Sequence, residues 1–518
     1  MSEQRNGSDW RTLVILFALA AAYRVLHYFF FSDFIVAGSD MMQNQLLAAK
    51  FASGNISGVL DPYWPPLYGV VVGAVTFFID DLIIPAVIVS IIAGSLVAPL
   101  TYVLTSQSYS RSTALAAGAL GVFYPYLLNT TFDLGTENIY LVVILGSLIC
   151  GWWAIERGSV VLSFVTGLLL ALAYLTRPEA IGYLFLFLLF LALSYWRNDR
   201  PALRPVFTNA GALVLGFVLL AAPYIGYLRH ETGVWTVSNK ASVNLAGGVL
   251  SPDADRNTAE LTTSKVEGRR LLREMVDAER IAQGFLQDLA PLFLFIFVAL
   301  GLFGTKWSSD RLFREAYLLT FFVLTTVGYI VTVVIERYFY VLLPIVFAWM
   351  SKGFEEAEDW LTGSLREWNL DRFGPFAKKA FVTVCIMFAF AYMFTLNFYV
   401  RSTESTWQSS AFEERDAGIW IRENGPASPR IFSGSFRPVF YAKGSQVWTE
   451  TESGAEILNE LKTMDVDYVI FNDRSIRKFP YLSEFSSLLR DSEDFELVYE
   501  NNEQEGYGVW VYKPISKN

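Results

Sequence analysis

Asp40 is the carboxylate with the clearest chemical potential, because it stands in the first polar segment after an apolar stretch of about residues 10–31. A stretch of that length can anchor in a bilayer, so Asp40 is expected beside the membrane surface. There a carboxylate can accept the proton of a hydroxyl nucleophile and so act as a general base. The competing interpretation is a cap of the helix predicted over residues 41–51, because Asp is favoured at helix N-termini.

Other ionisable residues stand at or near the ends of apolar segments. Arg24 lies within the outer part of the first segment, where an ionisable side chain is by default functional or paired. Arg177 and Arg337 each stand at the end of an apolar segment, and arginine can bind a phosphate through two parallel hydrogen bonds. The alternatives are interfacial anchoring and, for Arg177, local pairing with Glu179. Glu137 begins another apolar segment, where it can complement the helix dipole or position a substrate.

The elements that position these residues are membrane helices. The chain has 518 residues, of which 53% are hydrophobic and only 17% charged, whereas a soluble protein carries about a quarter charged residues. The first apolar segment is too long for a signal peptide and lacks its small-residue cleavage site. The sequence predicts a polytopic α-helical membrane protein with about 11 to 13 spans. Apolar segments lie near 10–31, 66–105, 113–132, 136–155, 160–176, 179–196, 207–228, 288–304, 315–335, 338–353 and 377–398.

Basic residues sort the connections into two sets. Lys and Arg concentrate in every second connection, which the positive-inside rule assigns to the cytoplasm. The first set comprises Arg111, Arg157, Arg197, Arg200, Arg204, Lys306, Arg311, Arg314, Lys352, Arg366, Arg372, Lys378 and Lys379. The other connections are therefore expected outside the cytoplasm, including the first external loop 32–65, the long loop 229–287 and the turns holding Glu137, Arg177 and Arg337.

The C-terminal part differs from the rest in composition. Residues 401–518 hold 13 basic and 20 acidic residues, a balance of -7 within a chain total of -10. Helical spacing over 413–424 and strand-like runs at 430–433, 468–471 and 507–512 predict a small α/β domain, with a short helix at 456–462. We therefore expect a membrane body over 1–400 and a soluble extracytoplasmic α/β domain over 401–518.

Several functional classes are disfavoured by the sequence. No basic run indicates nucleic-acid binding, and no Walker or dinucleotide loop indicates a nucleotide substrate. The first loop holds no acidic pair at ligand spacing and the whole chain has only two His, so the sequence predicts neither a metal site nor a cofactor. Cys150 and Cys385 both lie in apolar segments and are expected to fill the core.

An ordered set of motifs resembles GT-C-class membrane glycosyltransferases, and in particular the group of protein O-mannosyltransferases and lipid A aminoarabinose transferases. The set comprises Asp40, Pro65-Pro66-Leu67-Tyr68, Thr136-Glu137-Asn138, Leu175-Thr176-Arg177-Pro178-Glu179, Arg337-Tyr338 and Leu342-Leu343-Pro344. The C-terminal domain is similar to the external domain that many of these enzymes carry. Each motif is weak alone, whereas their order and spacing are fairly specific.

The resemblance implies transfer of a sugar from a polyprenyl-phosphate-linked donor to a glycan, lipid or protein acceptor outside the cytoplasm, usually with inversion. It implies that Asp40 is the base and that Glu137 is a second external acidic residue of the site. Many relatives have Glu directly after this Asp, but Met41 follows here, which leaves the sugar and the acceptor open.

The same resemblance suggests which residues contact the donor and acceptor. Arg24, Arg177, Lys240, Arg337 and Tyr338 are predicted to bind the lipid phosphate or donor, Lys240 because its loop resembles donor-facing segments of the family. Trp64 and Tyr68 are predicted to position sugar or acceptor, although Trp64 fits equally well in an aromatic belt at the membrane interface.

Two other functional classes fit the hydropathy. A transporter or flippase of lipid-linked sugars would usually show paired repeats with broken helices near the midplane, which the sequence lacks. A non-catalytic scaffold whose acidic C-terminal part binds a partner would make no demand on Asp40.

Overall fold

The computed structural model describes residues 10–32, 35–81, 83–197, 203–239, 292–332, 336–368, 411–449, 451–502 and 506–515, with isolated positions between 370 and 395. The chain forms two compact units. The helical unit comprises Met1–Phe30 and Asn44–Phe394, and the mixed unit comprises Phe31–Gln43 and Thr395–Asn518. The segment around Asp40 therefore groups with the C-terminal residues, although it is close in sequence to the first helices.

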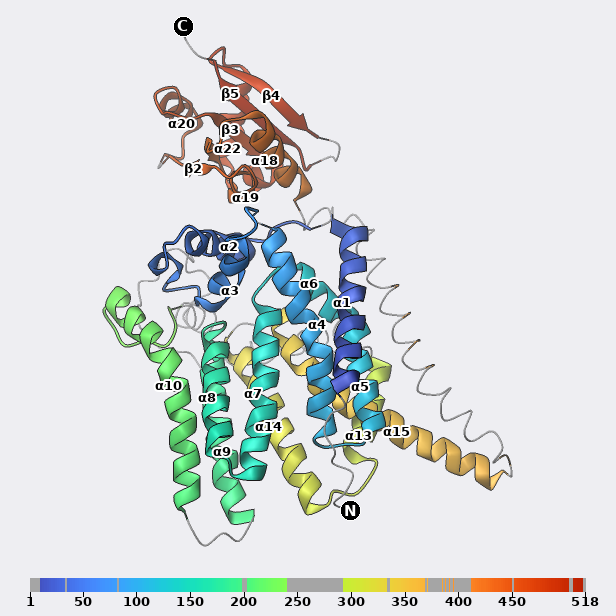
Figure 1. The fold of residues 1–518 in the computed structure, drawn as a ribbon. Coiled ribbons are helices and arrows are strands. Elements are labelled where there is room, and N and C mark those ends of the chain that lie inside the picture. The colour runs from blue at the N-terminus through green and yellow to red at the C-terminus, as the bar shows by residue number, and fades with distance from the viewer. Residues whose placement is uncertain are drawn as a thin grey trace, which may run out of the picture. The chain divides into compact units, whose positions relative to one another are not determined.

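The described helices before residue 370 are drawn in Figure 1. They are α1 (Trp10–Phe31), α2 (Ser39–Ala52), η2 (Ser57–Val59), α3 (Leu67–Thr76), α4 (Ile84–Ser106), α5 (Arg111–Phe123), α6 (Pro125–Phe132), α7 (Glu137–Arg157), α8 (Val160–Tyr174), η3 (Pro178–Gly182), α9 (Tyr183–Arg197), α10 (Arg204–Thr232), α13 (Leu292–Phe303), α14 (Ser309–Thr332), η6 (Glu336–Leu342) and α15 (Leu343–Glu367).

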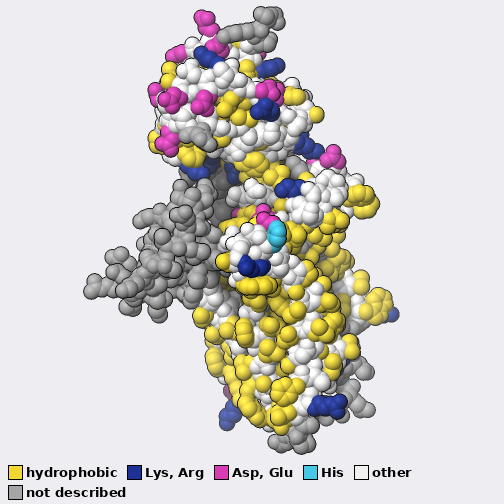
Figure 2. Space-filling view, turned by 90° about the vertical axis from the view of Figure 1, so that its left-hand side faces the viewer, with side chains coloured by type: hydrophobic (Ala, Val, Ile, Leu, Met, Phe, Trp, Pro, Cys, Tyr) yellow, Lys and Arg dark blue, Asp and Glu magenta, His cyan; other side chains and the backbone are white. Residues whose placement is uncertain are grey.

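The helical unit has the character of an integral membrane protein. Five segments of the described chain are long and apolar enough to cross a bilayer: Trp10–Phe31, Ile84–Ser106, Glu137–Arg157, Pro178–Arg197 and Arg204–Thr232. Hydrophobic side chains cover the face of this unit that includes α10 (Figure 2), and Phe207, Leu215 and Leu219 of that helix are exposed. The predicted polytopic helical class is confirmed, while the number of 11 to 13 spans stays a prediction.

Helices in this unit approach one another closely at glycines. A methyl group at Gly167 of α8 would lie 2.1 Å from Leu213 O, and one at Gly216 of α10 would lie 2.3 Å from Phe164 O. Small residues permit such backbone contact between membrane helices. The α8–α10 pair is therefore held by backbone proximity as well as by side-chain packing.

Three predicted apolar segments are divided in the structure. The segment 113–132 breaks between α5 and α6 at Pro125, because proline lacks an N–H and disfavours helical conformation in the residue before it. The segment 66–105 divides into α3 and α4 around Asp80 and Asp81, and 338–353 begins within the 3-10 turn η6. The segment 377–398 lies almost wholly outside the described residues.

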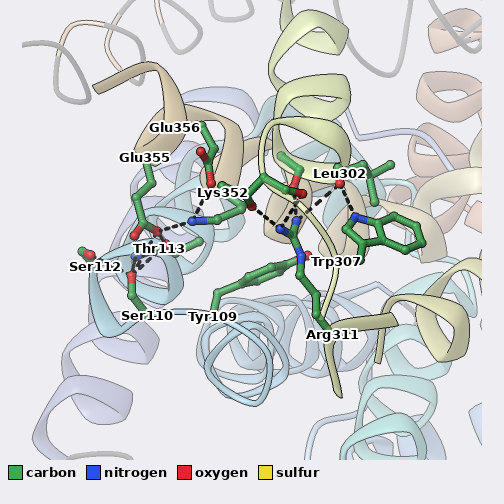
Figure 3. Close-up of polar contacts among 12 residues, drawn as sticks. Tyr109, Ser110, Ser112, Thr113, Leu302, Trp307, Arg311, Lys352, Glu355 and Glu356 are labelled. Carbon is green, nitrogen blue, oxygen red and sulfur yellow. Dashed lines mark hydrogen bonds and ion pairs between the residues drawn. The ribbon is translucent and has the colours of Figure 1, made fainter. Parts of the chain in front are cut away.

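One end of the helical unit is fixed by a polar network shown in Figure 3. Arg311 of α14 and the indole of Trp307 both donate to Leu302 O near the end of α13. Lys352 of α15 pairs with Glu356 at 2.8 Å. Thr113 of α5 donates to Glu355. These contacts join α14 to α13 and α5 to α15 at the end that carries the basic residues of the predicted cytoplasmic set.

The mixed unit contains a five-stranded sheet in the order β2-β1-β3-β5-β4, where β1 is parallel to β2 and β3, and β5 is antiparallel to β3 and β4. Its elements are α18 (Phe412–Asn424), β1 (Arg430–Ser433), α19 (Phe436–Tyr441), β2 (Ser445–Val447), α20 (Gly454–Leu461), β3 (Tyr468–Asn472), α21 (Asp473–Lys478), α22 (Tyr481–Arg490), β4 (Phe495–Asn501) and β5 (Val509–Pro514).

Helices pack on both faces of this sheet. Phe432, Phe471 and Tyr512 face one core with residues of α20 and α22. Their strand neighbours Ile431, Ile470 and Val511 face the other core with residues of α18 and α19. This alternation follows from the two-residue period of a strand. The predicted α/β class of the C-terminal part is confirmed, although the sequence did not indicate β2 or β4.

Candidate functional site

Arg177 is the centre of a buried ion-pair cluster at one end of the helical unit. Its Nη1 donates to Glu137 Oε1 at 3.2 Å and its Nε donates to Glu179 Oε1 at 2.6 Å. Glu137 Oε1 also lies 3.5 Å from Arg337 Nε. Three of the predicted site residues, Glu137, Arg177 and Arg337, are thus brought together from α7, the start of η3 and η6.

Aromatic rings surround the Arg177 guanidinium. Its Cζ atom lies 4.0 Å from the ring centroid of Tyr338 and 5.4 Å from that of Tyr140. Tyr329 of α14 donates its hydroxyl to Glu179 Oε1 at 3.0 Å. A guanidinium gains electrostatic attraction over ring faces when water is excluded. The rings and carboxylates together therefore orient Arg177 within a low-dielectric site.

Two of these aromatic residues were missed by sequence reasoning. Tyr140 follows Glu137 by three residues on α7, and helical spacing of i and i+3 could have placed the two on one face. Tyr329 lies within an apolar run of α14, where nothing in the sequence distinguishes it from a core residue.

The two carboxylate oxygens of Glu137 differ in their contacts. Its Oε2 is buried and accepts no hydrogen bond from the residues that the structure describes. A small cavity lies at the cluster. Its lining comprises Thr130, Glu137, Asn138, Tyr140, Leu141, Arg177, Arg337, Tyr338, Tyr340 and Val341. A buried acceptor beside a cavity is suited to binding a hydroxyl group.

The turn before Glu137 depends on Gly135 and on Tyr68. A methyl group at Gly135 would lie 2.1 Å from Glu137 Oε2, so only glycine leaves the carboxylate in place. Leu134 has a φ of 50°, which is uncommon for leucine. The hydroxyl of Tyr68, which is fully buried, donates to Leu134 O at 2.6 Å. Tyr68 therefore supports the turn that presents Glu137.

Arg24 is buried in the same unit, and among the described residues it has no acidic partner. Its Nε donates to Thr131 Oγ1 at 3.2 Å and its Nη1 donates to Ala20 O at 3.3 Å. Its Nη2 has no hydrogen-bond partner in the described part of the chain. A methyl group at Gly94 of α4 would lie 2.8 Å from Arg24 Nε and 3.4 Å from Asn138 Oδ1. Arg24 therefore contacts α6 through Thr131, beside a glycine of α4 that also lies near Asn138, the residue after Glu137.

The other predicted residues have separate places. Trp64 is half-buried in a loop where Asp61 Oδ1 accepts from the Trp64 amide at 2.9 Å, and its ring contacts that of Tyr63. Asp40 lies in the first turn of α2 and belongs to the mixed unit. Lys240 lies outside the described residues.

The ends of α7 carry different chemistry. Glu137 stands at one end, and Glu156 near the other end lies 3.8 Å from Arg314. A helix of 21 residues is about 30 Å long, comparable to the hydrocarbon core of a bilayer. Basic residues of the predicted cytoplasmic set and the Arg177 cluster are therefore separated by a membrane thickness.

Comparison with protein families gives one match within the chain. Residues 64–227 match the family described as dolichyl-phosphate-mannose-protein mannosyltransferase. The matched region includes Glu137 and Arg177. A search of curated proteins gave no match.

Several solved structures share this fold. ArnT from Cupriavidus metallidurans bound to undecaprenyl phosphate is 12% identical, with a TM-score of 0.56, over 96% of this chain and 97% of that chain. The same protein in the apo state gives 0.55 at 12% identity, over 98% of each chain. The Archaeoglobus fulgidus oligosaccharyltransferase complexed with Zn and sulfate is 13% identical with a TM-score of 0.51, over 89% of this chain and 68% of that one. These matches agree with the resemblance found in the motifs.

Proposed function

We propose that this GT-C-type membrane glycosyltransferase moves a sugar from a polyprenyl-phosphate-linked donor to an acceptor hydroxyl on the extracytoplasmic side of the membrane, with inversion. The observation that carries the proposal is the buried Glu137–Arg177–Arg337 cluster in a chain with this fold. The ArnT structure contains undecaprenyl phosphate, so a lipid phosphate of this kind is the product expected to leave this site.

Asp40 is the general base in this proposal. The acceptor oxygen bonds to the anomeric carbon while the bond from that carbon to the phosphate oxygen breaks. The proton of the acceptor passes to Asp40, and the bonding electrons leave with the polyprenyl phosphate. A single displacement needs one such base on the face opposite the leaving group. The first turn of α2 suits this role because a carboxylate there is also favoured by the helix dipole.

Arg337 is the proposed first contact of the lipid phosphate. Its side chain is 30% exposed, whereas that of Arg177 is 10% exposed. Arg177 is held by two carboxylates and supplies fixed positive charge behind it. Such oriented cations stabilise the charge that develops on a leaving phosphate. Tyr338 orients both guanidiniums, since its ring lies 4.0 Å from Arg177 Cζ and 5.8 Å from Arg337 Cζ.

The remaining site residues have supporting roles. Arg24 offers the Nη2 group that has no partner within the described chain, and we assign it to the donor side together with Lys240. Glu137 Oε2 is proposed to accept a hydrogen bond from a hydroxyl of sugar or acceptor. Trp64 is proposed to stack on a sugar face. Tyr68 is proposed to position Glu137 through its hydrogen bond to the turn at Leu134.

The proposal includes a location for each part of the chain. The membrane body, residues 1–400, lies in the cell or plasma membrane. Residues 401–518 form a soluble domain outside the cytoplasm. The separation of the Arg177 cluster from the basic end of α7 supports this sidedness, because Lys and Arg favour cytoplasmic connections.

Replacement of the base tests the reaction directly. We expect Asp40→Asn to insert and fold normally but to lower turnover by about 10²-fold or more, the range of general-base contributions. Transfer of labelled sugar from lipid-linked donors purified from the native membrane is the measurement. Asp80→Asn, in the connection between α3 and α4, is the matched control and is expected to keep full activity. Wild-type turnover in Asp40→Asn would exclude Asp40 as the base.

A further inference from the structure

The segment that leads into Asp40 is held by side chains of the C-terminal domain. Residues Phe31–Gln43 form one compact unit with Thr395–Asn518. Within it, the buried Ala37 donates its N–H to the Tyr441 hydroxyl oxygen at 2.7 Å and accepts at its carbonyl from Arg437 Nε at 3.0 Å. Both backbone polar groups of Ala37 are therefore satisfied by two side chains of one helix, α19.

The two side chains are themselves fixed. Arg437 and Tyr441 are four residues apart on α19, so they lie on one helix face. Arg437 Nη1 donates to Glu414 Oε2 at 2.5 Å, and Glu414 is only 2% exposed. Glu414 also accepts from Ser435 Oγ and Asn472 Nδ2, both at 2.9 Å. Asn472 caps α21 at the end of β3, so the contact to Ala37 is anchored in the sheet.

An ion pair between Arg437 and a nearly inaccessible carboxylate is expensive to desolvate unless its geometry is well satisfied. Here the pair fixes the guanidinium so that its Nε–H points at the carbonyl of Ala37, a residue far away in sequence. Burial raises the pKa of Tyr441, against a lowering by its hydrogen bond from Ala37, so the hydroxyl stays neutral across the physiological range.

We propose that Arg437 and Tyr441 are positioning residues for Asp40, so that the C-terminal domain takes part in transfer by fixing the entry into α2. This inference rests on the proposed role of Asp40 as base. Ala37 precedes Asp40 by three residues, and the first helical hydrogen bond runs from Met42 N to Gly38 O at 2.9 Å. Without the two contacts, the first turn of α2 would fray as helix termini do. A displacement of about 1 Å at a reacting group can reduce rate by about 10²-fold.

Variants of the full-length protein in nanodiscs test the proposal. Tyr441→Phe removes only the oxygen that accepts from Ala37, and Arg437→Gln removes the donor to its carbonyl. Hydrogen exchange of the peptide covering residues 35–43 and steady-state transfer are measured for each. We expect at least tenfold faster exchange in that peptide, kcat at least tenfold lower, and KM for the donor within twofold of wild type. A KM held constant shows that the donor site is intact, and exchange in β1 and β3 separates positioning from a general loss of structure.

Arg430→Gln is the matched control. Arg430 lies in the same domain, where its Nη1 pairs with the exposed Asp465 at 2.7 Å, and we expect wild-type exchange and turnover. Exchange in β1 and β3 reports whether the domain itself is folded. If Arg437→Gln destabilises the domain, Tyr441→Phe alone tests the proposal. Unchanged exchange at 35–43, or faster exchange with wild-type kcat, would overturn the positioning role.

Asp40→Asn separates this proposal from the one on which it rests. Full activity of Asp40→Asn would show that Asp40 is not the general base. Arg437 and Tyr441 would then have no catalytic group to position, even if exchange at 35–43 responds to their replacement. An inactive Asp40→Asn together with fully active Tyr441→Phe and Arg437→Gln variants would refute the positioning role alone.

Discussion

The Arg177 side chain shows how one residue can organise a membrane site. A single guanidinium joins Glu137 and Glu179 while it lies against the ring of Tyr338. Lysine has a point charge and no planar fork, so it cannot reproduce these contacts together. The cluster contains two arginines and two glutamates, so in the proposed reaction the lipid phosphate competes with Glu137 for Arg337.

Removal of Arg177 leaves two carboxylates without their shared cation. We expect Arg177→Gln to lower the free energy of unfolding by about 3–5 kcal/mol, the cost of breaking a buried pair, and to weaken binding of undecaprenyl phosphate at least tenfold. Thermal unfolding in detergent and a lipid-binding titration are the measurements.

The matched control is Arg197→Gln at the other end of the helical unit. Arg197 pairs with Asp310, which is 72% exposed, and exposed pairs contribute about 0–1 kcal/mol. An equal loss of stability in the two variants would contradict the prediction that the buried Arg177 pairs contribute more than an exposed pair.

At the scale of helices, glycine sets how closely the elements approach. A methyl group on Gly216 of α10 would lie 2.3 Å from Phe164 O of α8, whereas Gly211 of the same helix has open space where a side chain would stand. The two positions are thus a matched pair, because both are helical and only one is in contact.

Substitution by alanine distinguishes the two glycines. We expect Gly216→Ala to destabilise the helical unit by about 1–3 kcal/mol, as overpacking does, because a backbone oxygen cannot move aside. Gly211→Ala is expected to be neutral or stabilising, since alanine favours helix by about 1 kcal/mol over glycine. Thermal unfolding of both variants checks the prediction, and a stabilised Gly216→Ala would contradict the described α8–α10 contact.

At the scale of the whole molecule, the proposed sidedness of the chain rests on where its charged residues lie. The Arg177 cluster lies at one end of α7, and the basic residues around Arg311 lie at the other. The proposed transfer takes place outside the cytoplasm, so it requires the end of α7 with the Arg177 cluster to face away from the cytoplasm.

Cysteine labelling in intact cells tests that orientation. Ser57→Cys and Ser445→Cys are exposed positions on the proposed outer side, and Lys306→Cys is exposed on the proposed cytoplasmic side. We expect a membrane-impermeant maleimide to label the first two directly and Lys306→Cys only after permeabilisation. The unsubstituted chain is the control for labelling of Cys150 and Cys385. The opposite pattern would reverse the topology and place Asp40 on the wrong side for the proposed reaction.

The sequence by itself determined most of the elements of this protein. Apolar length and the distribution of Lys and Arg locate the membrane helices, because both signals act on short segments. Short-range patterns also located parts of the C-terminal domain. They are the strand-forming runs at 430–433 and 468–471 and the helix breaker after Asn424. The sequence also predicted the pairing of Arg177 with Glu179, since only Pro178 separates them.

Only the tertiary structure decided which distant residues share a site. Arg177 meets Glu137 from 40 residues earlier, and Arg337 reaches the same carboxylate from another helix end. Ala37 meets Tyr441 across 404 residues. Long-range contacts of this kind depend on how whole helices and domains pack, and no local pattern of residue types encodes that packing.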